Sequence, residues 1–112
     1  VLAMWKMMQK KVPKDYVIST GKQYSVKYFV NLVAKELKLK ISWKGQGLKE
    51  CGYLNNNKLI LIDKKYFRPT EVESLLGDSK CARKELKWKP SFNLNQLVRD
   101  MVDQELIDLS AK

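Results

Sequence analysis

A short apolar segment, a glycine and then an amphipathic helix together constrain the fold of this chain most strongly. Tyr16-Val17-Ile18 predicts a short buried strand, the segment ends at Gly21, and Ser25 is placed to cap the helix that follows. The apolar stripe of that helix consists of Val26, Phe29, Val30, Val33 and Leu37. Strand, glycine and helix in this order predict an α/β protein.

Further strands are predicted after this helix. Ile41-Ser42-Trp43 predicts one strand, and Leu59-Ile60-Leu61-Ile62 predicts another that is buried. Between them, residues 44–57 carry three of the five glycines and a run of asparagines, so we expect a flexible loop or an irregular hairpin. The predicted strands are short and separated by turns.

Helices are predicted at both ends of the chain. Val1, Met4, Trp5 and Met8 recur at helical spacing, and no capping residue precedes them, so we expect the chain to begin within a helix. A small helix is predicted from about Ser79 to Leu86. The apolar face of a final helix consists of Leu94, Leu97, Val98, Met101 and Val102.

Size and composition indicate one globular domain. The chain has 112 residues, of which 45% are hydrophobic and 30% charged. Apolar runs such as Leu59 to Ile62 are far shorter than the roughly 20 residues of a membrane-spanning helix. The first residues also lack the pattern of a secretory signal. We therefore expect a cytoplasmic protein without a membrane partner.

The net charge of +10 raises the possibility of nucleic-acid binding, because basic surfaces attract phosphates. However, 19 of the 22 basic residues are lysines scattered along the chain. The three arginines, which would read bases or phosphates with two hydrogen bonds, are isolated: Arg68, Arg83 and Arg99. This distribution is typical of a solvated surface, and we do not expect a nucleic-acid partner.

The residues give no complete catalytic or metal site. Histidine is absent, and Cys51 and Cys81 lack the spacing of a zinc site, so free thiols are expected. Gly45-Gln46-Gly47 has too few glycines for a dinucleotide-binding loop, and no tyrosine has a lysine four residues later. Glu71 and Glu73 lie two residues apart near Asp78, but such a carboxylate pair without metal ligands is more typical of a solvated surface than of an acid–base site. The chain alone is predicted to be non-catalytic.

The segment Arg68-Pro69-Thr70-Glu71-Val72 permits two interpretations. Proline favours an extended backbone at Arg68, whose guanidinium can then bind a diphosphate, while Glu71 can accept hydrogen bonds from ribose hydroxyls or a guanine edge. Alternatively, Thr70 and Glu73 form a helix capping box, and Arg68 pairs with a nearby acid. The pattern by itself does not decide between them.

A set of motifs along the chain resembles the carboxy-terminal third of the GDP-mannose 4,6-dehydratases, which belong to the extended short-chain dehydrogenases. The motifs are Ala3-Met4-Trp5, Asp15-Tyr16-Val17-Ile18 to Thr20-Gly21, Ser25-Val26, Tyr66-Phe67-Arg68-Pro69-Thr70-Glu71-Val72, Leu75-Leu76-Gly77-Asp78, Leu86 with Trp88-Lys89-Pro90, and Leu97-Val98-Arg99-Asp100-Met101-Val102. Two positions depart from the family pattern: Cys81 replaces a lysine, and Lys87 replaces a glycine that commonly precedes the tryptophan.

The resemblance implies a division of labour within a longer enzyme. A Rossmann half, which this chain lacks, would bind NADP and carry the catalytic residues. In the family, NADP oxidises the mannose at C4, water is lost across C5 and C6, and the hydride returns at C6. Residues 1–112 would be the small substrate-binding subdomain, inactive alone, with Arg68 on the diphosphate of GDP-mannose or GDP and Glu71 on the ribose or base. The full-length protein would be a homo-oligomer that serves the synthesis of GDP-fucose and other GDP-deoxysugars.

Two other classes of protein remain open. A free-standing nucleotide-binding or regulatory module would keep Arg68 and Glu71 without catalysis, whereas a basic structural or nucleic-acid-binding protein would need neither residue. The coding sequence upstream of Val1 discriminates between them, because a Rossmann half with Tyr-x-x-x-Lys there would make the chain part of an enzyme.

Overall fold

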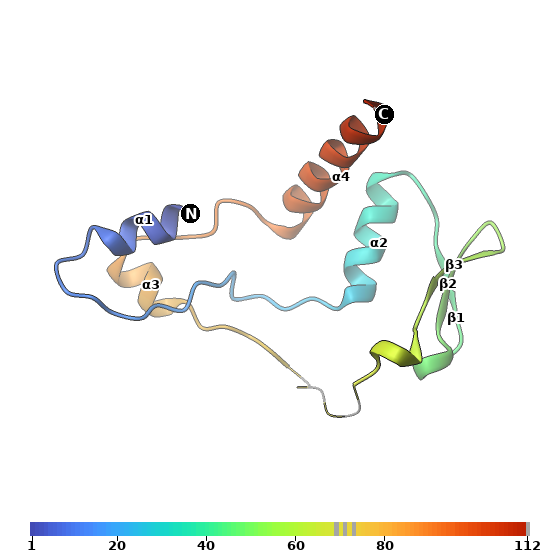
Figure 1. The fold of residues 1–112 in the computed structure, drawn as a ribbon, viewed down its shortest axis with the longest axis horizontal. Helices are drawn as coiled ribbons and strands as arrows, with labels where there is room; N and C mark the ends of the chain where they lie inside the picture. The colour runs from blue at the N-terminus through green and yellow to red at the C-terminus, as the bar shows by residue number, and fades with distance from the viewer. Residues whose placement is uncertain (69, 71, 73, 112) are drawn as a thin grey trace. The chain divides into compact units, whose positions relative to one another are not determined.

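The computed structural model describes residues 1–68, 70, 72 and 74–111, and shows a small α/β structure (Figure 1). The chain divides into two compact units: unit 1 comprises Val1–Tyr24 and Glu73–Leu94, and unit 2 comprises Ser25–Val72 and Asn95–Lys112. No helix in the described ranges combines the length and apolar character needed to cross a membrane. The predicted α/β class is confirmed, whereas the assignment of residues 1–112 to one GDP-binding subdomain stays a prediction.

Unit 1 contains two short helices, α1 (Leu2–Met8) and α3 (Lys80–Glu85), both of which the sequence predicts. Its buried side chains are small or few: Ala3, Ala82, Leu86 and the polar Ser79. Among the described residues, Val1 gives α1 no side-chain cap. Unit 1 therefore has a small apolar core, and we expect polar contacts between its two chain segments to contribute a larger share of its stability.

The prediction of a buried strand at Tyr16-Val17-Ile18 is wrong. The segment has no regular secondary structure and belongs to no sheet, and Val17 and Ile18 are 54% and 40% exposed. Side-chain hydrogen bonds hold it instead: the Tyr16 hydroxyl donates to Glu85 Oε2 at 2.8 Å, and Ser19 Oγ donates to the Gly77 carbonyl at 2.7 Å. An apolar run predicts extended backbone, but only a neighbouring strand makes that backbone part of a sheet.

Unit 2 contains two longer helices, α2 (Val26–Glu36) and α4 (Leu94–Ser110), whose first residue belongs to unit 1. The predicted cap is confirmed, because Ser25 Oγ accepts a hydrogen bond from the Tyr28 amide at 3.1 Å. Ala34 of α2 and Val98 and Val102 of α4 are buried, and both helices line one apolar groove. The two helices thus provide the apolar core of unit 2.

Unit 2 also contains an antiparallel sheet of strands β1 (Ser42–Lys44), β2 (Cys51–Leu54) and β3 (Asn57–Leu61). Asn55 and Asn56 connect β2 to β3 with positive φ angles of 49° and 67°, the conformation of a tight type I′ hairpin turn. The two predicted strands and the irregular hairpin between them are confirmed with small shifts at their ends. The predicted burial is wrong, because Leu59 and Leu61 of β3 are 55% and 62% exposed.

Side chains connect the sheet to α2. Trp43 Nε1 of β1 donates to Asn31 Oδ1 at 2.8 Å, and Lys27 Nζ lies 4.9 Å from the centroid of the Trp43 ring. Lys27 also forms an ion pair with Glu50. Gly52 of β2 gives the indole room, since a Cβ there would lie 3.3 Å from Trp43 Cζ3.

Candidate functional site

Arg68 lies in an open depression on unit 2. The depression measures about 580 Å³ and is lined by Leu61, Ile62, Asp63, Tyr66, Phe67 and Arg68. Tyr66 and Phe67 are 73% and 51% exposed, and Arg68 is exposed as well. Two solvent-facing aromatic rings beside a guanidinium form a surface that suits a ligand with a flat ring and an anionic group.

A capped turn builds this depression. Asp63 Oδ1 accepts a hydrogen bond from the Lys65 amide at 2.9 Å and thereby caps the 3-10 helix η2 (Lys64–Tyr66). The chain leaves η2 in an extended conformation at Phe67, whose φ and ψ are -70° and 126°. The turn therefore presents Tyr66, Phe67 and Arg68 consecutively beside the end of β3.

The structure tests the two interpretations of the Arg68 segment only in part. Glu71 lies outside the described residues, as do Pro69 and Glu73. Among the residues that the structure describes between Thr70 and Ser79, none is helical, which removes the helix that a capping box at Thr70 would need. Within the same described ranges no acid forms an ion pair with Arg68. The role of Glu71 stays a prediction.

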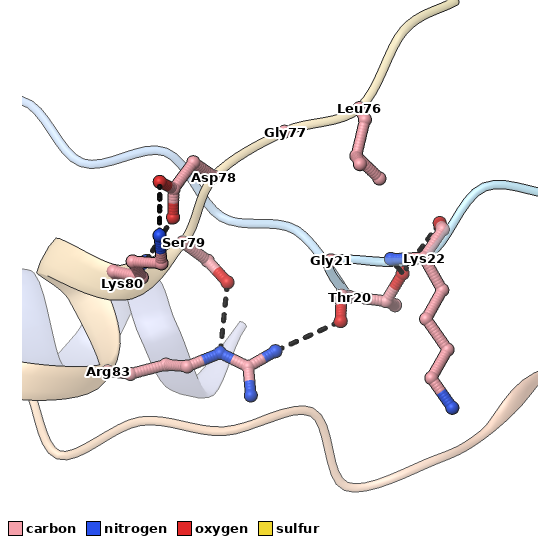
Figure 2. Close-up of a pocket in the computed structure, with 9 residues that line it drawn as sticks. All are labelled: Thr20, Gly21, Lys22, Leu76, Gly77, Asp78, Ser79, Lys80 and Arg83. Carbon is pink, nitrogen blue, oxygen red and sulfur yellow. Dashed lines mark hydrogen bonds and ion pairs between the residues drawn. The ribbon is translucent and has the colours of Figure 1, made fainter.

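A second hollow, in unit 1, was not predicted from the sequence. It measures about 540 Å³ and is lined by Thr20, Gly21, Lys22, Leu76, Gly77, Asp78, Ser79, Lys80 and Arg83 (Figure 2). Arg83 of α3 connects residues 76–83 to residues 20–22. Its Nε donates to Ser79 Oγ at 3.0 Å, and its Nη2 donates to the Thr20 carbonyl at 2.9 Å. Thr20 and Arg83 lie 63 residues apart, so local patterns could not reveal this contact.

Asp78 is the acidic member among the described residues of this hollow. Its Oδ1 accepts a hydrogen bond from the Lys80 amide at 2.9 Å, and Oδ2 lies 3.5 Å from Lys80 Nζ. The backbone hydrogen bond from Lys80 lowers the pKa of Asp78, and the charges of Lys80 and Arg83 act in the same direction. Asp78 is thus an ionised carboxylate whose partners lie within its own turn.

A third polar cluster ties Tyr16 and Lys14 to α3. Lys14 Nζ donates to Glu85 Oε1 at 2.6 Å, and the Tyr16 hydroxyl donates to Oε2. The hydrogen bond from Lys14, followed by the bond from Tyr16, lowers the pKa of Glu85 to about 2. The same carboxylate raises the pKa of Lys14 and the pKa of Tyr16. Each group is stabilised in its ordinary charge state, which indicates a structural tie.

The glycines after β1 do not form a dinucleotide-binding loop. Gly45 and Gly47 lead into the 3-10 helix η1 (Gly47–Lys49) and then into the antiparallel strand β2. A pyrophosphate loop requires instead a turn from a strand into an α-helix whose first amides face the phosphates. These residues do not fit NADP, and no step through NADP is assigned to them. Cys51 and Cys81 are free thiols.

Comparison with known proteins identifies the family. The family profile described as GDP-mannose 4,6 dehydratase matches residues 1–101. This chain belongs to the GDP-mannose 4,6-dehydratase family. Relatives include "GDP-mannose 4,6 dehydratase 2" of Caenorhabditis elegans, 41% identical over 112 residues, and "GDP-mannose 4,6 dehydratase" of Drosophila melanogaster, 44% identical over 108 residues. A Vibrio cholerae relative, "GDP-mannose 4,6-dehydratase", is 38% identical over 118 residues.

The chain is much shorter than these GDP-mannose 4,6-dehydratases. The matches cover 99%, 95% and 95% of this chain, but only 29%, 27% and 32% of the C. elegans, D. melanogaster and V. cholerae proteins. Arg68 and the hollow around Arg83 both lie within the residues that match the family profile. The resemblance inferred from the motifs is therefore confirmed at the level of the family.

Lys87 shows why one departure from the family pattern matters structurally. It follows α3 with a φ of 48°, in the left-handed region, where glycine carries no steric penalty and lysine does. Lys6 Nζ donates to the Lys87 carbonyl at 2.9 Å. The glycine expected from the motif would suit this backbone better than the lysine present here.

Proposed function

We propose that this chain is the carboxy-terminal, substrate-binding part of a GDP-mannose 4,6-dehydratase and that it binds the GDP end of GDP-mannose. The observation that carries the proposal is the exposed Arg68 guanidinium beside exposed Tyr66 and Phe67, within the residues that match the family. The full-length enzyme is proposed to be an NADP-dependent lyase of the extended short-chain dehydrogenase family, acting in the synthesis of GDP-fucose and related GDP-deoxysugars. It is further proposed to be a cytoplasmic homo-oligomer.

The proposed role of Arg68 is to bind the diphosphate. The planar guanidinium presents parallel N–H donors that match two phosphate oxygens, and such charge-assisted bonds are stronger than neutral ones. Glu71 is proposed to accept hydrogen bonds from the ribose hydroxyls or from the guanine edge. The exposed rings of Tyr66 and Phe67 offer flat apolar surface beside the same arginine.

Catalysis would depend on this binding indirectly. Interactions with the nucleotide, which does not react, supply binding energy that positions the sugar for chemistry elsewhere. The catalytic groups and NADP are proposed to lie in the remainder of the full-length protein. The 112-residue chain is expected to show no dehydratase turnover, and measurable turnover by rigorously purified chain would contradict that expectation.

The decisive test is GDP binding by Arg68 variants of the full-length protein. Arg68→Ala should cost roughly 1.5 to 3 kcal/mol of binding free energy, about 10- to 150-fold in Kd, because one charge-assisted partner of the diphosphate is lost. Arg68→Lys should recover only part of this loss, since an ammonium lacks the planar pair of donors. Glu71→Ala should cost less, about 1 kcal/mol for each hydrogen bond to a neutral group.

Matched controls separate binding from folding. Arg99→Ala removes an exposed arginine of α4 that pairs with Glu36, and should leave GDP affinity within about twofold. Calorimetric titration with GDP beside thermal melts of every variant distinguishes the two effects. If Arg68→Ala binds GDP as tightly as the parent, the proposed role of Arg68 is wrong. If Thr70→Ala and Glu73→Ala lower the melting temperature without changing GDP affinity, these two residues contribute to stability and not to GDP binding.

A further inference from the structure

The hollow of Figure 2 contains a guanidinium in a fixed position. Arg83 Nε and Nη2 each donate one hydrogen bond, to Ser79 Oγ and to the Thr20 carbonyl. Ser79 is only 3% exposed, so the anchor of this arginine is a buried side chain. Within the described ranges the third guanidinium nitrogen donates no hydrogen bond, and none is drawn to it among the residues of Figure 2. Arg83 thus has donors left for a ligand and already occupies a defined position, which lowers the entropic cost of binding.

Gly21 leaves the guanidinium accessible. Its φ of 73° lies in the left-handed region, and a Cβ at this position would lie 3.6 Å from Arg83 Nη2. A longer side chain would cover the guanidinium, whereas the bare backbone allows a ligand to approach it closely. Thr20 fixes the turn here, because its hydroxyl oxygen accepts from the Lys22 amide at 3.3 Å and donates to the Lys22 carbonyl at 3.2 Å.

The charge of the hollow is positive. Among the described residues that line it, three are cations, Lys22, Lys80 and Arg83, and one is an anion, Asp78, which gives these residues a net charge of +2. Asp78 is engaged by the amide and ammonium of Lys80, so its charge is offset mainly by that residue. Within the described ranges no acid pairs with Lys22. Lys22 and Arg83 therefore remain as two cations available to an anion.

We propose that this hollow binds an oxyanion of the phosphate class, independently of the Arg68 depression in unit 2. Arg83 would donate from its free nitrogen and Lys22 would supply a second charge beside the uncovered backbone of Gly21. The volume of about 540 Å³ lies within the usual 300 to 1,000 Å³ of small-molecule sites and exceeds the space one phosphate group needs. Both free inorganic phosphate and the phosphate group of a small sugar phosphate therefore satisfy the chemistry.

The test is a titration of the isotopically labelled 112-residue chain followed by ¹H–¹⁵N chemical shifts. Inorganic phosphate is added at constant ionic strength, with chloride as the reference salt, and glucose 1-phosphate is used in a parallel arm. We expect saturable shifts of the Gly21 and Lys22 amides and of the Arg83 Nε–H signal. Tighter binding of glucose 1-phosphate would assign the site to organic phosphates, and equal or weaker binding would assign it to the free anion.

Two variants make the result specific. Lys22→Ala should weaken phosphate binding about two- to fivefold, the effect of one exposed charge. Gly21→Ala should weaken it further, because a Cβ would meet the guanidinium and strain the turn. The control is Lys84→Ala, an exposed lysine of α3 that does not line the hollow, and it should leave the Kd unchanged. Arg83 is left intact because it also bonds Ser79 and Thr20.

The proposal has clear failing outcomes. Shifts that rise linearly with phosphate, that chloride reproduces, or that Lys84→Ala reduces as much as Lys22→Ala would show only a general attraction to a basic surface. A Gly21→Ala variant that keeps the far-UV circular dichroism of the parent and binds phosphate equally well would also overturn it. Because these residues all belong to unit 1, the result does not depend on the function proposed for Arg68.

Discussion

In unit 2 the chain is stabilised by regular structure: a capped helix, a hydrogen-bonded hairpin sheet, and two buried valines on α4. In unit 1 the segment that precedes Tyr24 has no regular structure after α1, and its described contacts to residues 77–85 are individual polar bonds made by Lys14, Tyr16, Ser19 and Thr20. Apolar packing distributes stability over many atoms, whereas separate polar bonds concentrate it in a few residues. Substitutions should therefore act differently in the two units.

The largest effect is expected for Val98→Ala in unit 2. Val98 is 2% exposed, and loss of two methyl groups together with the cavity left behind should lower the free energy of unfolding by about 2 kcal/mol. Hydrogen exchange should increase chiefly in α2 and α4. The matched control is Leu106→Ala on the same helix, where the side chain is 51% exposed and the loss should be below about 1 kcal/mol. Equal losses for both variants would contradict the proposed core.

The next effect is expected for Gly77→Ala in unit 1. A Cβ at this position would lie 2.8 Å from Ser19 Cβ and 2.9 Å from Ser19 Oγ, so one of the two segments must shift. We expect a loss of about 1.5 kcal/mol, as is usual for overpacking, with increased hydrogen exchange at residues 16–20. Adding Ser19→Gly should restore part of the loss by removing the opposing Cβ. No loss in the single variant would show that the two segments are loosely associated.

A smaller effect of opposite sign is expected for Lys87→Gly. Its left-handed φ of 48° favours glycine, so relief of backbone strain should raise the free energy of unfolding by about 0.5 to 1 kcal/mol. Lys84→Gly, inside α3, serves as the control and should lower it by about 1 kcal/mol. Chemical denaturation of both variants measures the difference, and destabilisation by Lys87→Gly would refute the interpretation of this cap.

The smallest effect at neutral pH, and the one most dependent on pH, is expected for Glu85→Gln. The pKa of Glu85 in the folded chain is about 2, below its usual value of 4.5, because Lys14 and then Tyr16 donate to the carboxylate. Its contribution to stability is therefore fully present above about pH 4.5 and is lost as the pH falls toward 2.

Thermal melts between pH 2 and pH 6 test this expectation. The melting temperatures of parent and Glu85→Gln should differ above pH 4.5 and converge as the pH approaches 2. Glu105→Gln on α4 provides a carboxylate control in unit 2. A constant difference across the whole range would mean that the ionised carboxylate of Glu85 contributes nothing through Lys14 and Tyr16.

The sequence predicted best those features that depend on neighbours along the chain. Ser25 was identified as the cap of α2, and the periodicity of Leu94 to Val102 located α4, because a helix forms its bonds within one segment. The asparagine run marked the hairpin turn for the same reason. Tyr16-Val17-Ile18 failed as a strand, since strand formation depends on a partner that the pattern of one segment does not contain.

The two candidate sites also differ in whether they depend on neighbours along the chain or on residues far apart in the sequence. The exposure of Arg68 could be expected because the proline that follows it favours extended backbone, and the η2 turn at Asp63 is a local structure. The hollow around Arg83 could not be expected, since it joins residues 20–22 to residues 76–83 through a bond over 63 positions. Burial was predicted poorly at Leu59 and Leu61, because hydrophobicity does not determine what covers a strand.

The position of Trp43 gives the chain an internal optical reporter. Its indole nitrogen is bonded to Asn31 and its ring lies beneath the Lys27 ammonium, so its excited state is sensitive to both groups on α2. The other two tryptophans, Trp5 and Trp88, belong to unit 1. In a chain that retains Trp43 alone, with phenylalanine at the other two positions, the emission wavelength and lifetime would follow separation of the sheet from α2 without any added dye.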